Sequence, residues 1–243
     1  MSYILIVGAK SDIAKAVARE YAKHGYDLYL AARDVNDLEA FAKDITTRTQ
    51  QDVRLVELDI LDYAQHQPVY DNLREKPLGI VSAVGYLGDQ EKAQYDFSEA
   101  QKIIDTNYTG VVSLLNIVAN DFEKRRSGFI VGISSVAGDR GRKSNYIYGS
   151  AKAALTAYLS GLRNRLYDAQ VHVLTVKPGF VATKMTEDMD LPEKLTAQPD
   201  EVAQDIFEAQ QKGENVLYTK WIWKWIMLII KLIPEFQFKK MSI

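Results

Sequence analysis

Three side chains in the second half of the chain have the types and the spacing that carbonyl chemistry requires. Tyr148 and Lys152 are four residues apart, so a helix that begins near Tyr148 places both on one face, one turn apart. Ser135 precedes Tyr148 by thirteen residues. A hydroxyl, a phenol and an ammonium brought together can bind a carbonyl oxygen, give it a proton and lower the pKa of the phenol. The tyrosine and lysine also fit an exposed helical pair, so the surrounding elements must decide between the two interpretations.

Composition limits the classes of function. The 243 residues have a formal net charge of -2, with 47% hydrophobic and 26% charged residues. This balance predicts a sizeable core and gives no basic surface for nucleic acid, which we exclude as a partner. The lack of cysteine excludes disulfides and thiolate sites. His24, His66 and His172 lie far apart along the chain, so we expect surface or strand-end positions for them and no metal site.

The N-terminal residues give no sign of a secretory signal. Met1-Ser2-Tyr3 leads directly into the apolar run 4–7, with no charged segment before it and no small-residue cleavage site after it. Together with the absence of cysteine, this start predicts a cytoplasmic protein.

Short apolar runs alternate with helical patterns along most of the chain. Runs rich in Val, Ile and Leu predict strands at residues 3–7, 26–32, 53–58, 78–84, 129–133, 171–176 and 216–219. Helical patterns cover residues 11–23, 34–47, 62–75, 98–122, 146–167 and 199–211. This alternation predicts an α/β fold, a Rossmann-type doubly wound parallel sheet with helices on both faces. We assign residues 1–219 to this single domain and residues 220–243 to an apolar, aromatic extension of it.

The turn after the first predicted strand is a candidate phosphate site. In doubly wound sheets, ligands bind beyond the carboxyl ends of the strands, where the N-terminus of a helix offers free amides. Gly8 suits the tight turn at this point. Asp12 would repel a phosphate unless it turns outward or caps the helix. A plain turn with Ser11 or Asp12 as the N-cap is the alternative.

Taken in order, the strand-end segments resemble those of the short-chain dehydrogenase/reductase family. The matching residues are Ser135, Tyr148 and Lys152, then Asn107 inside a predicted helix, and the turn 178–183. The resemblance implies hydride transfer between a nicotinamide and a ketone or secondary alcohol. It implies that Ser135 binds the substrate oxygen, Tyr148 is the acid/base and Lys152 tunes Tyr148 and holds the ribose. Asn107 would bend its helix and hold a water of the proton relay.

The resemblance also implies a dinucleotide site, with two departures from the family pattern. Asp12 and Ala14 replace glycines of the phosphate loop, and Ser82-Ala83-Val84-Gly85 replaces Asn-Asn-Ala-Gly. Arg33 follows Ala32, where an acid would favour NAD(H), so NADP(H) is favoured and NAD(H) stays open. The alternative makes Arg33 a solvated helix-start residue and Asp34 an N-cap. The implied cofactor-binding residues are Gly8, Lys10, Ser11, Asp12, Ile13, Arg33, Asp59, Ile60, Ala83, Gly85, Tyr148, Lys152, Pro178, Gly179, Val181 and Thr183.

Residues 184–198 fall where the family has a mobile substrate lid. Met185 and Met189 suit an apolar substrate, whereas Glu187, Asp188 and Asp190 disfavour a polyanionic one. The substrate class that follows is a small carbonyl or alcohol compound.

The segment from Trp221 to Ile233 combines three tryptophans with aliphatic residues and two lysines. It is too short to span a bilayer, which takes about 20 apolar residues. It fits either burial in a homo-oligomer, with the lysines reaching out, or an interfacial helix on a membrane. The segment is similar to the tail of short-chain reductases that act on polyprenyl-phosphate sugars, which implies a lipid-linked substrate and peripheral contact with the inner membrane face. A non-catalytic dinucleotide-binding sensor or subunit with the same fold is the alternative, favoured by Asp12 and the missing Asn pair.

Overall fold

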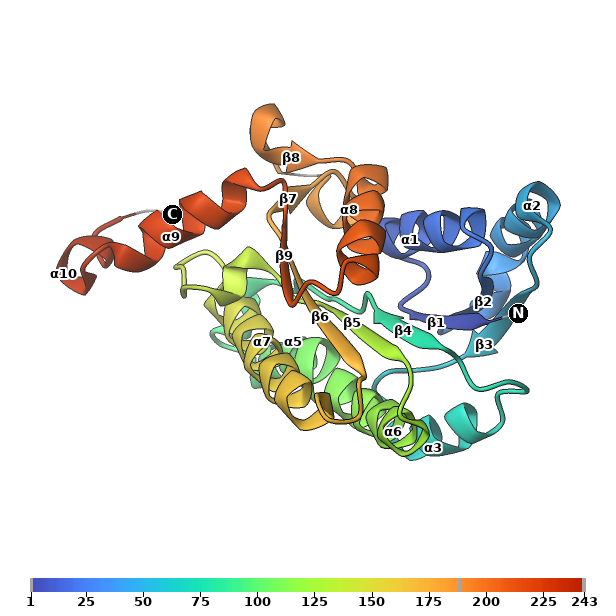
Figure 1. The fold of residues 1–243 in the computed structure, drawn as a ribbon. Helices are drawn as coiled ribbons and strands as arrows, with labels where there is room; N and C mark the ends of the chain where they lie inside the picture. The colour runs from blue at the N-terminus through green and yellow to red at the C-terminus, as the bar shows by residue number, and fades with distance from the viewer. Residues whose placement is uncertain (1, 188, 242–243) are drawn as a thin grey trace.

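A seven-stranded parallel sheet forms the centre of the molecule (Figure 1). The computed structural model describes residues 2–187 and 189–241. The strands follow the order β3-β2-β1-β4-β5-β6-β9, so the direction of winding reverses between β1 and β4. The strands are β1 (Tyr3–Val7), β2 (Asp27–Ala32), β3 (Val53–Glu57), β4 (Gly79–Ser82), β5 (Phe129–Ile133), β6 (His172–Pro178) and β9 (Val216–Thr219). The predicted doubly wound sheet is confirmed.

Helices cover both faces because alternate strand residues point to opposite sides. Ile4 and Ile6 pack under one helical layer, whereas Leu5 and Val7 pack under the other. The first layer contains α1 (Asp12–Lys23), α2 (Glu39–Thr49) and α8 (Pro199–Gln211), and the second contains α3 (Tyr63–Asp71), α6 (Gly110–Arg125) and α7 (Tyr146–Leu166). Two shorter helices, α4 (Gln90–Ala93) and α5 (Phe97–Ile104), precede α6. The sheet is therefore buried on both faces, and its strand ends are left to form a site.

Several predicted elements have different limits in the structure; the helix predicted at 62–75, for example, covers Tyr63–Asp71. Two further differences bear on the strand-end site. The helix predicted at 34–47 begins with a 3-10 turn, η1 (Val35–Leu38), because Asp34 adopts a left-handed φ of 48°. The Glu57 carboxylate accepts hydrogen bonds from the backbone N–H groups of Asp34 and Val35, at 2.9 Å each, and holds this turn. The strand predicted at 78–84 ends at Ser82, which leaves the next three residues to line the strand-end site.

The helix predicted at 98–122 is interrupted by a π turn, η2 (Asp105–Thr109), at Asn107. The Asn107 side chain is fully buried. Its Nδ2 donates to the carbonyl oxygens of Tyr86 at 2.6 Å and Ile103 at 2.8 Å, and its Oδ1 accepts from the Tyr86 N–H at 3.2 Å. The helix is therefore interrupted at Asn107, whose side chain fastens it to the segment that follows β4.

The surface or strand-end position expected for His66 is wrong. His66 is fully buried between α3 and α6, where its Nδ1 lies 2.9 Å from Ser113 Oγ and its Nε2 lies 3.3 Å from the Asp59 carbonyl oxygen. Tyr70, one helical turn later, is buried as well. The two residues therefore form the inner face of a helix whose sequence looks polar throughout.

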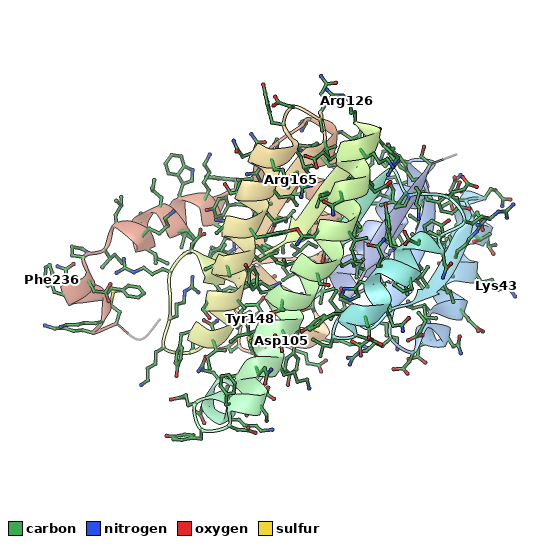
Figure 2. All side chains as sticks on the ribbon, turned by 90° about the horizontal axis from the view of Figure 1, so that it is seen from below. Lys43, Asp105, Arg126, Tyr148, Arg165 and Phe236 are labelled. Atoms are coloured by element: carbon green, nitrogen blue, oxygen red, sulfur yellow. The ribbon has the colours of Figure 1, made fainter. Side chains whose placement is uncertain are left out.

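The C-terminal segment forms a helix, α9 (Ile222–Leu232), followed by the short α10 (Glu235–Phe238). Trp223 and Met227 are buried against Val136, and the Trp223 indole lies so close to Gly179 that a Cβ there would come within 2.0 Å of it. Figure 2 shows this pair of helices projecting from the body of the fold, with Phe236 near the tip. The extension thus packs through a small inner face and leaves most of its apolar surface open.

Candidate active site

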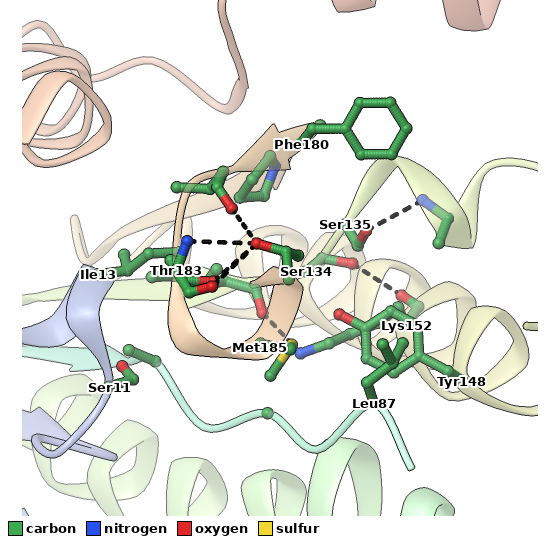
Figure 3. A pocket seen from close by; sticks show the side chains of 18 of the residues that line it. Ser11, Ile13, Leu87, Ser134, Ser135, Tyr148, Lys152, Phe180, Thr183 and Met185 are labelled. Atoms are coloured by element: carbon green, nitrogen blue, oxygen red, sulfur yellow. Dashed lines mark hydrogen bonds between the residues drawn. The ribbon is translucent and has the colours of Figure 1, made fainter. Parts of the chain in front are cut away.

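Ser135, Tyr148 and Lys152 face one pocket (Figure 3). Ser135 follows β5 and caps a 3-10 turn, η3 (Val136–Gly138), where its Oγ accepts the Ala137 N–H at 3.1 Å. Tyr148 and Lys152 lie in the first two turns of α7, and the Lys152 Nζ is 5.7 Å from the centre of the Tyr148 ring. The structure therefore brings together the three side chains that the sequence predicts to be neighbours.

Two glycines allow η3 and α7 to approach each other closely. A Cβ on Gly138 would lie 2.7 Å from the Ala153 nitrogen, and a Cβ on Gly149 would lie 2.8 Å from the Ala137 carbonyl oxygen. A larger residue at either position would push the turn away from the helix. The distance between Ser135 and Tyr148 therefore depends on the absence of two side chains.

Lys152 is buried, with 2% of its surface exposed. Its Nζ donates to the carbonyl oxygens of Ile133 at 3.0 Å and Val84 at 3.2 Å, which end β5 and follow β4. Burial lowers the pKa of Lys152 to about 7, because the ammonium has lost most of its hydration and no carboxylate replaces it. The amine therefore titrates near neutral pH.

The pKa of Tyr148 moves in the direction opposite to the one expected from its lysine neighbour. Burial raises the pKa of Tyr148 to about 12, and a hydrogen bond with Ser135 opposes that rise. Lys152 is directed to two carbonyl oxygens and does not offset the effect of burial on Tyr148. In the protein by itself, Tyr148 is a protonated phenol.

Asn107 lies behind this group and does not line the pocket. A Cβ built on Gly85 would lie 3.7 Å from the Asn107 Oδ1 and 3.8 Å from the Lys152 Nζ, so these two polar groups flank the bare backbone of Gly85. The Asn107 side chain is directed to backbone groups of Tyr86 and Ile103. Its observed contacts position the strand-end segment.

Two adjoining cavities, of about 350 and 330 Å3, follow the carboxyl ends of the strands. Together they form an elongated cleft from the end of β3 to Tyr148, which suits an extended dinucleotide. One cavity is lined by Lys10, Ser11, Asp12, Ile13, Ala83, Gly85, Tyr148, Lys152, Pro178, Gly179, Val181 and Thr183. The other is lined by Gly8, Lys10, Ser11, Arg33, Asp59, Ile60, Ala83 and Gly85. The structure thus brings every predicted cofactor-binding residue to one cleft.

The two polar side chains at the start of α1, Ser11 and Asp12, both accept hydrogen bonds from backbone N–H groups. Ser11 is the N-cap of α1 and accepts the Ala14 N–H at 3.2 Å. The Asp12 carboxylate, which lines the cavity, accepts the backbone N–H of Lys184 at 2.8 Å. Gly8 has a φ of 78°, and a Cβ there would lie 3.0 Å from the backbone of residue 83. Ser11 thus takes the Ala14 N–H, and within the described part of the chain the N–H groups of Asp12 and Ile13 are left to meet an anion.

Two basic side chains, Arg33 and Lys10, line the cavity beyond the phosphate loop. Arg33 is 64% exposed in its side chain, with its Nη1 4.0 Å from the Asp59 Oδ2, and Lys10 pairs with Asp37 at 2.6 Å. The Asp59 Oδ1 accepts the Leu61 N–H at 2.9 Å and so also orders the turn after β3. Asp34 is an N-cap by position, but its side chain makes no capping hydrogen bond. The end of β2 offers an arginine, and Ala32 provides no carboxylate there.

Sequence reasoning missed a buried ion pair behind the serine turn. Lys177 Nζ lies 2.5 Å from the Asp139 Oδ1, and the Tyr218 hydroxyl donates to the Asp139 Oδ2 at 2.7 Å. This pair connects β6, β9 and the loop after η3. A lysine within the apolar strand β6 is the feature of the sequence that indicates a buried charge. Its partner lies 38 residues away in the sequence, so local patterns do not reveal the pair.

The model of the short chain dehydrogenase family matches residues 2–194. The chain belongs to the short-chain dehydrogenase family. It is 36% identical, over 98% of its length and 96% of the relative's, to an uncharacterized oxidoreductase of Mycobacterium tuberculosis. A relative from Schizosaccharomyces pombe named NADP-dependent 3-hydroxy acid dehydrogenase is 28% identical, with 88% of each chain covered. A short-chain dehydrogenase of Sphingobium yanoikuyae, solved in complex with NADPH, superimposes with a TM-score of 0.84 at 24% identity over 97% of each chain.

This membership makes the chain an oxidoreductase of the short-chain dehydrogenase family. Among residues 2–187 and 189–241, no group of three metal-ligating side chains occurs. No helix within that part of the chain is long and apolar enough to cross a membrane.

The burial of Lys152 predicts a characteristic dependence of stability on pH. Its pKa is about 7 in the folded protein and 10.5 in a free lysine, so between these values the unfolded chain binds more protons. The free energy of unfolding of the cofactor-free protein should rise with pH across this window, by at most about 1.4 kcal/mol per pH unit from this group.

Urea titrations of wild type and Lys152→Met between about pH 7.5 and 9 measure that slope. We expect a shallower slope for the variant, because the titrating amine is gone. Lys124→Met, which removes an exposed lysine of α6, should keep the wild-type slope. Parallel slopes for wild type and Lys152→Met would contradict the assignment.

Proposed function

We propose that this protein reduces a ketone to a secondary alcohol with NADP(H). The observation that carries the proposal is the convergence of Ser135, Tyr148 and Lys152 on one end of the elongated cleft. Support comes from the S. pombe relative named as NADP-dependent and from the similar structure solved with NADPH. A catalytic group next to a dinucleotide-shaped cleft favours an enzyme over a non-catalytic sensor.

The residues divide the proton chemistry among them. The Ser135 hydroxyl accepts the Ala137 N–H and keeps its own proton to donate to the carbonyl oxygen of the substrate. Tyr148, protonated at neutral pH because its pKa is about 12, gives that oxygen a proton. The nicotinamide, when bound, supplies the hydride. Lys152, whose pKa is about 7, is poised to exchange a proton next to the phenol.

The cleft also suggests how NADP(H) is held. The free amides at the start of α1, from Asp12 to Ile13, suit the pyrophosphate, and Gly8 leaves room for it. Arg33 is placed for the 2′-phosphate, with Lys10 as support, and Asp59 and Ile60 line the adenosine end. At the other end, Lys152 suits the ribose, while Thr183 and Val181 face the position of the carboxamide.

The preference for NADP(H) is tested by thermal melts with NADPH and NADH. A ligand present at about 100 times its Kd adds about 2.7 kcal/mol of stability to the folded state. We expect NADPH to raise the melting temperature more than NADH, and Arg33→Gln to remove that difference. Arg48→Gln, an exposed arginine on α2, is the matched control and should preserve it. A larger shift with NADH in wild type would reverse the preference.

The role of Tyr148 is tested by Tyr148→Phe, which removes only the acidic hydroxyl. We expect kcat for NADPH-dependent reduction of a ketone panel to fall at least about a hundredfold, in line with the typical contribution of general acid catalysis. The melting shift with NADPH should persist, which separates binding from chemistry. The control Tyr146→Phe changes an exposed residue two positions earlier and should keep full activity. NADPH binding without turnover of any ketone by wild type would favour the sensor.

We further propose that the extension formed by α9 and α10 rests on an anionic membrane surface. Residues 220–243 contain five lysines and one glutamate, a net charge of +4, whereas the whole chain has -2 and the remainder therefore has -6. Outward-facing aromatic and aliphatic residues share this segment with the lysines, as in interfacial helices. The exposed apolar residues that the structure describes here are Trp221, Ile222, Trp225, Leu228, Ile229, Leu232, Phe236 and Met241. This contact would give the site access to a lipid-linked substrate.

Flotation with liposomes tests the membrane contact. The variant Trp225→Ser/Ile229→Ser changes residues that are 54% and 64% exposed and leaves the buried Trp223 in place. We expect wild type to float with phosphatidylglycerol-containing vesicles, less with phosphatidylcholine alone, and the variant to remain unbound. The matched control Tyr95→Ser/Phe97→Ser removes two exposed aromatic residues that lie far from the extension in the sequence, and it should float like wild type. A wild type that does not float, but changes from an oligomer to a monomer on the same substitutions, would place a second copy on this face.

A further inference from the structure

Arg142 is a cation at the catalytic pocket without a carboxylate partner in the described part of the chain. It lies in the loop between η3 and α7 and lines the same cavity as Tyr148. Its Nη2 makes a hydrogen bond of 3.3 Å to the Met227 sulfur, which is a weak acceptor. Its Nε is buried and, among residues 2–187 and 189–241, has no hydrogen-bond partner. Most of the donor capacity of this guanidinium is therefore left unused.

The neighbouring charges are engaged elsewhere. Arg140, two residues earlier, donates to the carbonyl oxygens of Ile230 and Ile233 and to the Glu235 carboxylate. Asp139, which is close enough to favour the charged form of Arg142, already accepts from Lys177 and from the Tyr218 hydroxyl. Burial lowers the pKa of Arg142, so holding this cation next to the pocket costs stability. Such a cost is expected where a ligand completes the hydrogen bonds.

The acidic group at the pocket does not neutralise Arg142. Asp12 is held by the backbone N–H of Lys184, 172 residues away in the sequence. Glu187 and Asp190, whose charges argued against a polyanionic substrate, line a different cavity. Four basic side chains, Lys10, Arg142, Lys152 and Lys184, line the pocket beside a single carboxylate, that of Asp12, so basic groups are in excess there.

We infer that Arg142 determines specificity by binding a single anionic group of the substrate, a carboxylate or a phosphate, while Tyr148 and Ser135 bind the ketone. This inference rests on the proposed function. A guanidinium presents several N–H groups in one plane and suits the paired oxygens of such an anion. Met227, which contacts Arg142, packs in a cluster with Val136 and Phe180, so the anion lies at the end of the pocket beside α9.

The rest of the pocket defines the remainder of this substrate. Leu87, Phe180, Met185 and Met189 give it an apolar lining. Apolar surface combined with one unpaired cation suits an amphiphile with one anionic group. A neutral ketone would leave the donors of Arg142 without partners, and such loss of pairing is a strong source of discrimination.

The test measures binding, so it does not depend on turnover. Protein saturated with NADP+ fills the phosphate sites of the cofactor, and calorimetric titrations then compare hexyl phosphate, 1-hexanol and inorganic phosphate. We expect wild type to bind hexyl phosphate at least about tenfold more tightly than 1-hexanol, a difference of about 1.4 kcal/mol. Arg142→Gln should abolish this preference and Arg142→Lys should keep part of it. Lys143→Gln removes an exposed charge from the same loop and should bind like wild type.

The possible results distinguish free phosphate from a phosphate monoester as the ligand. They also distinguish a failure of this inference from a failure of the proposed function. Inorganic phosphate could bind as tightly as hexyl phosphate in wild type and fail to bind to Arg142→Gln. That result would support the anion site and would show that the phosphate group alone is recognised. Equal affinities for hexyl phosphate and 1-hexanol in wild type, or a preference that survives in Arg142→Gln, would overturn the inference. Retained NADPH-induced melting shifts in Arg142→Gln show that the variant folds. Because no ketone is turned over in these titrations, their result stands whether or not Tyr148 proves catalytic.

Discussion

The burial of the Lys152 ammonium is the constraint on which the site depends. A lysine without solvent or a carboxylate needs backbone acceptors, and it finds them at Ile133 and Val84, at the ends of two neighbouring strands. Those two carbonyl oxygens fix the first turns of α7 over the middle of the sheet. The same geometry places Tyr148 next to Ser135, and it works only because Gly138 and Gly149 let the turn and the helix touch. One buried side chain therefore ties the start of α7 to the ends of two central strands.

This constraint explains why the unusual sequence after β4 is tolerated. Ser82 ends the strand, and the segment that follows contributes mainly backbone: the Ala83 N–H pairs with the Val7 carbonyl oxygen and the Val84 carbonyl oxygen accepts from Lys152. Asn107 then bonds to both backbone groups of Tyr86. Since backbone groups carry these contacts, the side chains of the family's usual Asn pair are not needed to hold the segment in place.

The sequence predicts those parts of the fold that rest on local signals. The strands at 3–7, 129–133 and 216–219 and the helix at 199–211 have the predicted limits, because each is an apolar or amphipathic run with clear ends. Pro199 and the reciprocal bonds between Gln198 and Glu201 mark the start of that last helix. The predicted site residues also come together, since parallel strands bring their carboxyl ends to one edge.

What the sequence could not provide is the long-range pairing of charged groups. Nothing near Asp12 indicates that its partner is the N–H of Lys184, and nothing near Arg142 indicates Met227, 85 residues later. The pKa of Tyr148 differs from the expectation for a related reason: in the protein without cofactor, burial raises it, because the lysine one turn away is itself buried and directed to carbonyl oxygens. Burial, which depends on the whole fold, decides the sign.

The C-terminal helix α9 connects the outer surface of the protein to the pocket that contains Tyr148. Trp223 of α9 fills the space over Gly179, a pocket residue, and Arg140 holds the end of α9 from the loop that begins after the catalytic turn. The helix α9 therefore contacts a pocket residue at one point and the loop after η3 at another. Because Arg142 lies between α9 and that pocket, whatever the helix rests on is next to the place where an anionic group would bind. The apolar extension and the guanidinium of Arg142 are therefore neighbours in the fold, and the two proposals made for them concern one side of the same pocket.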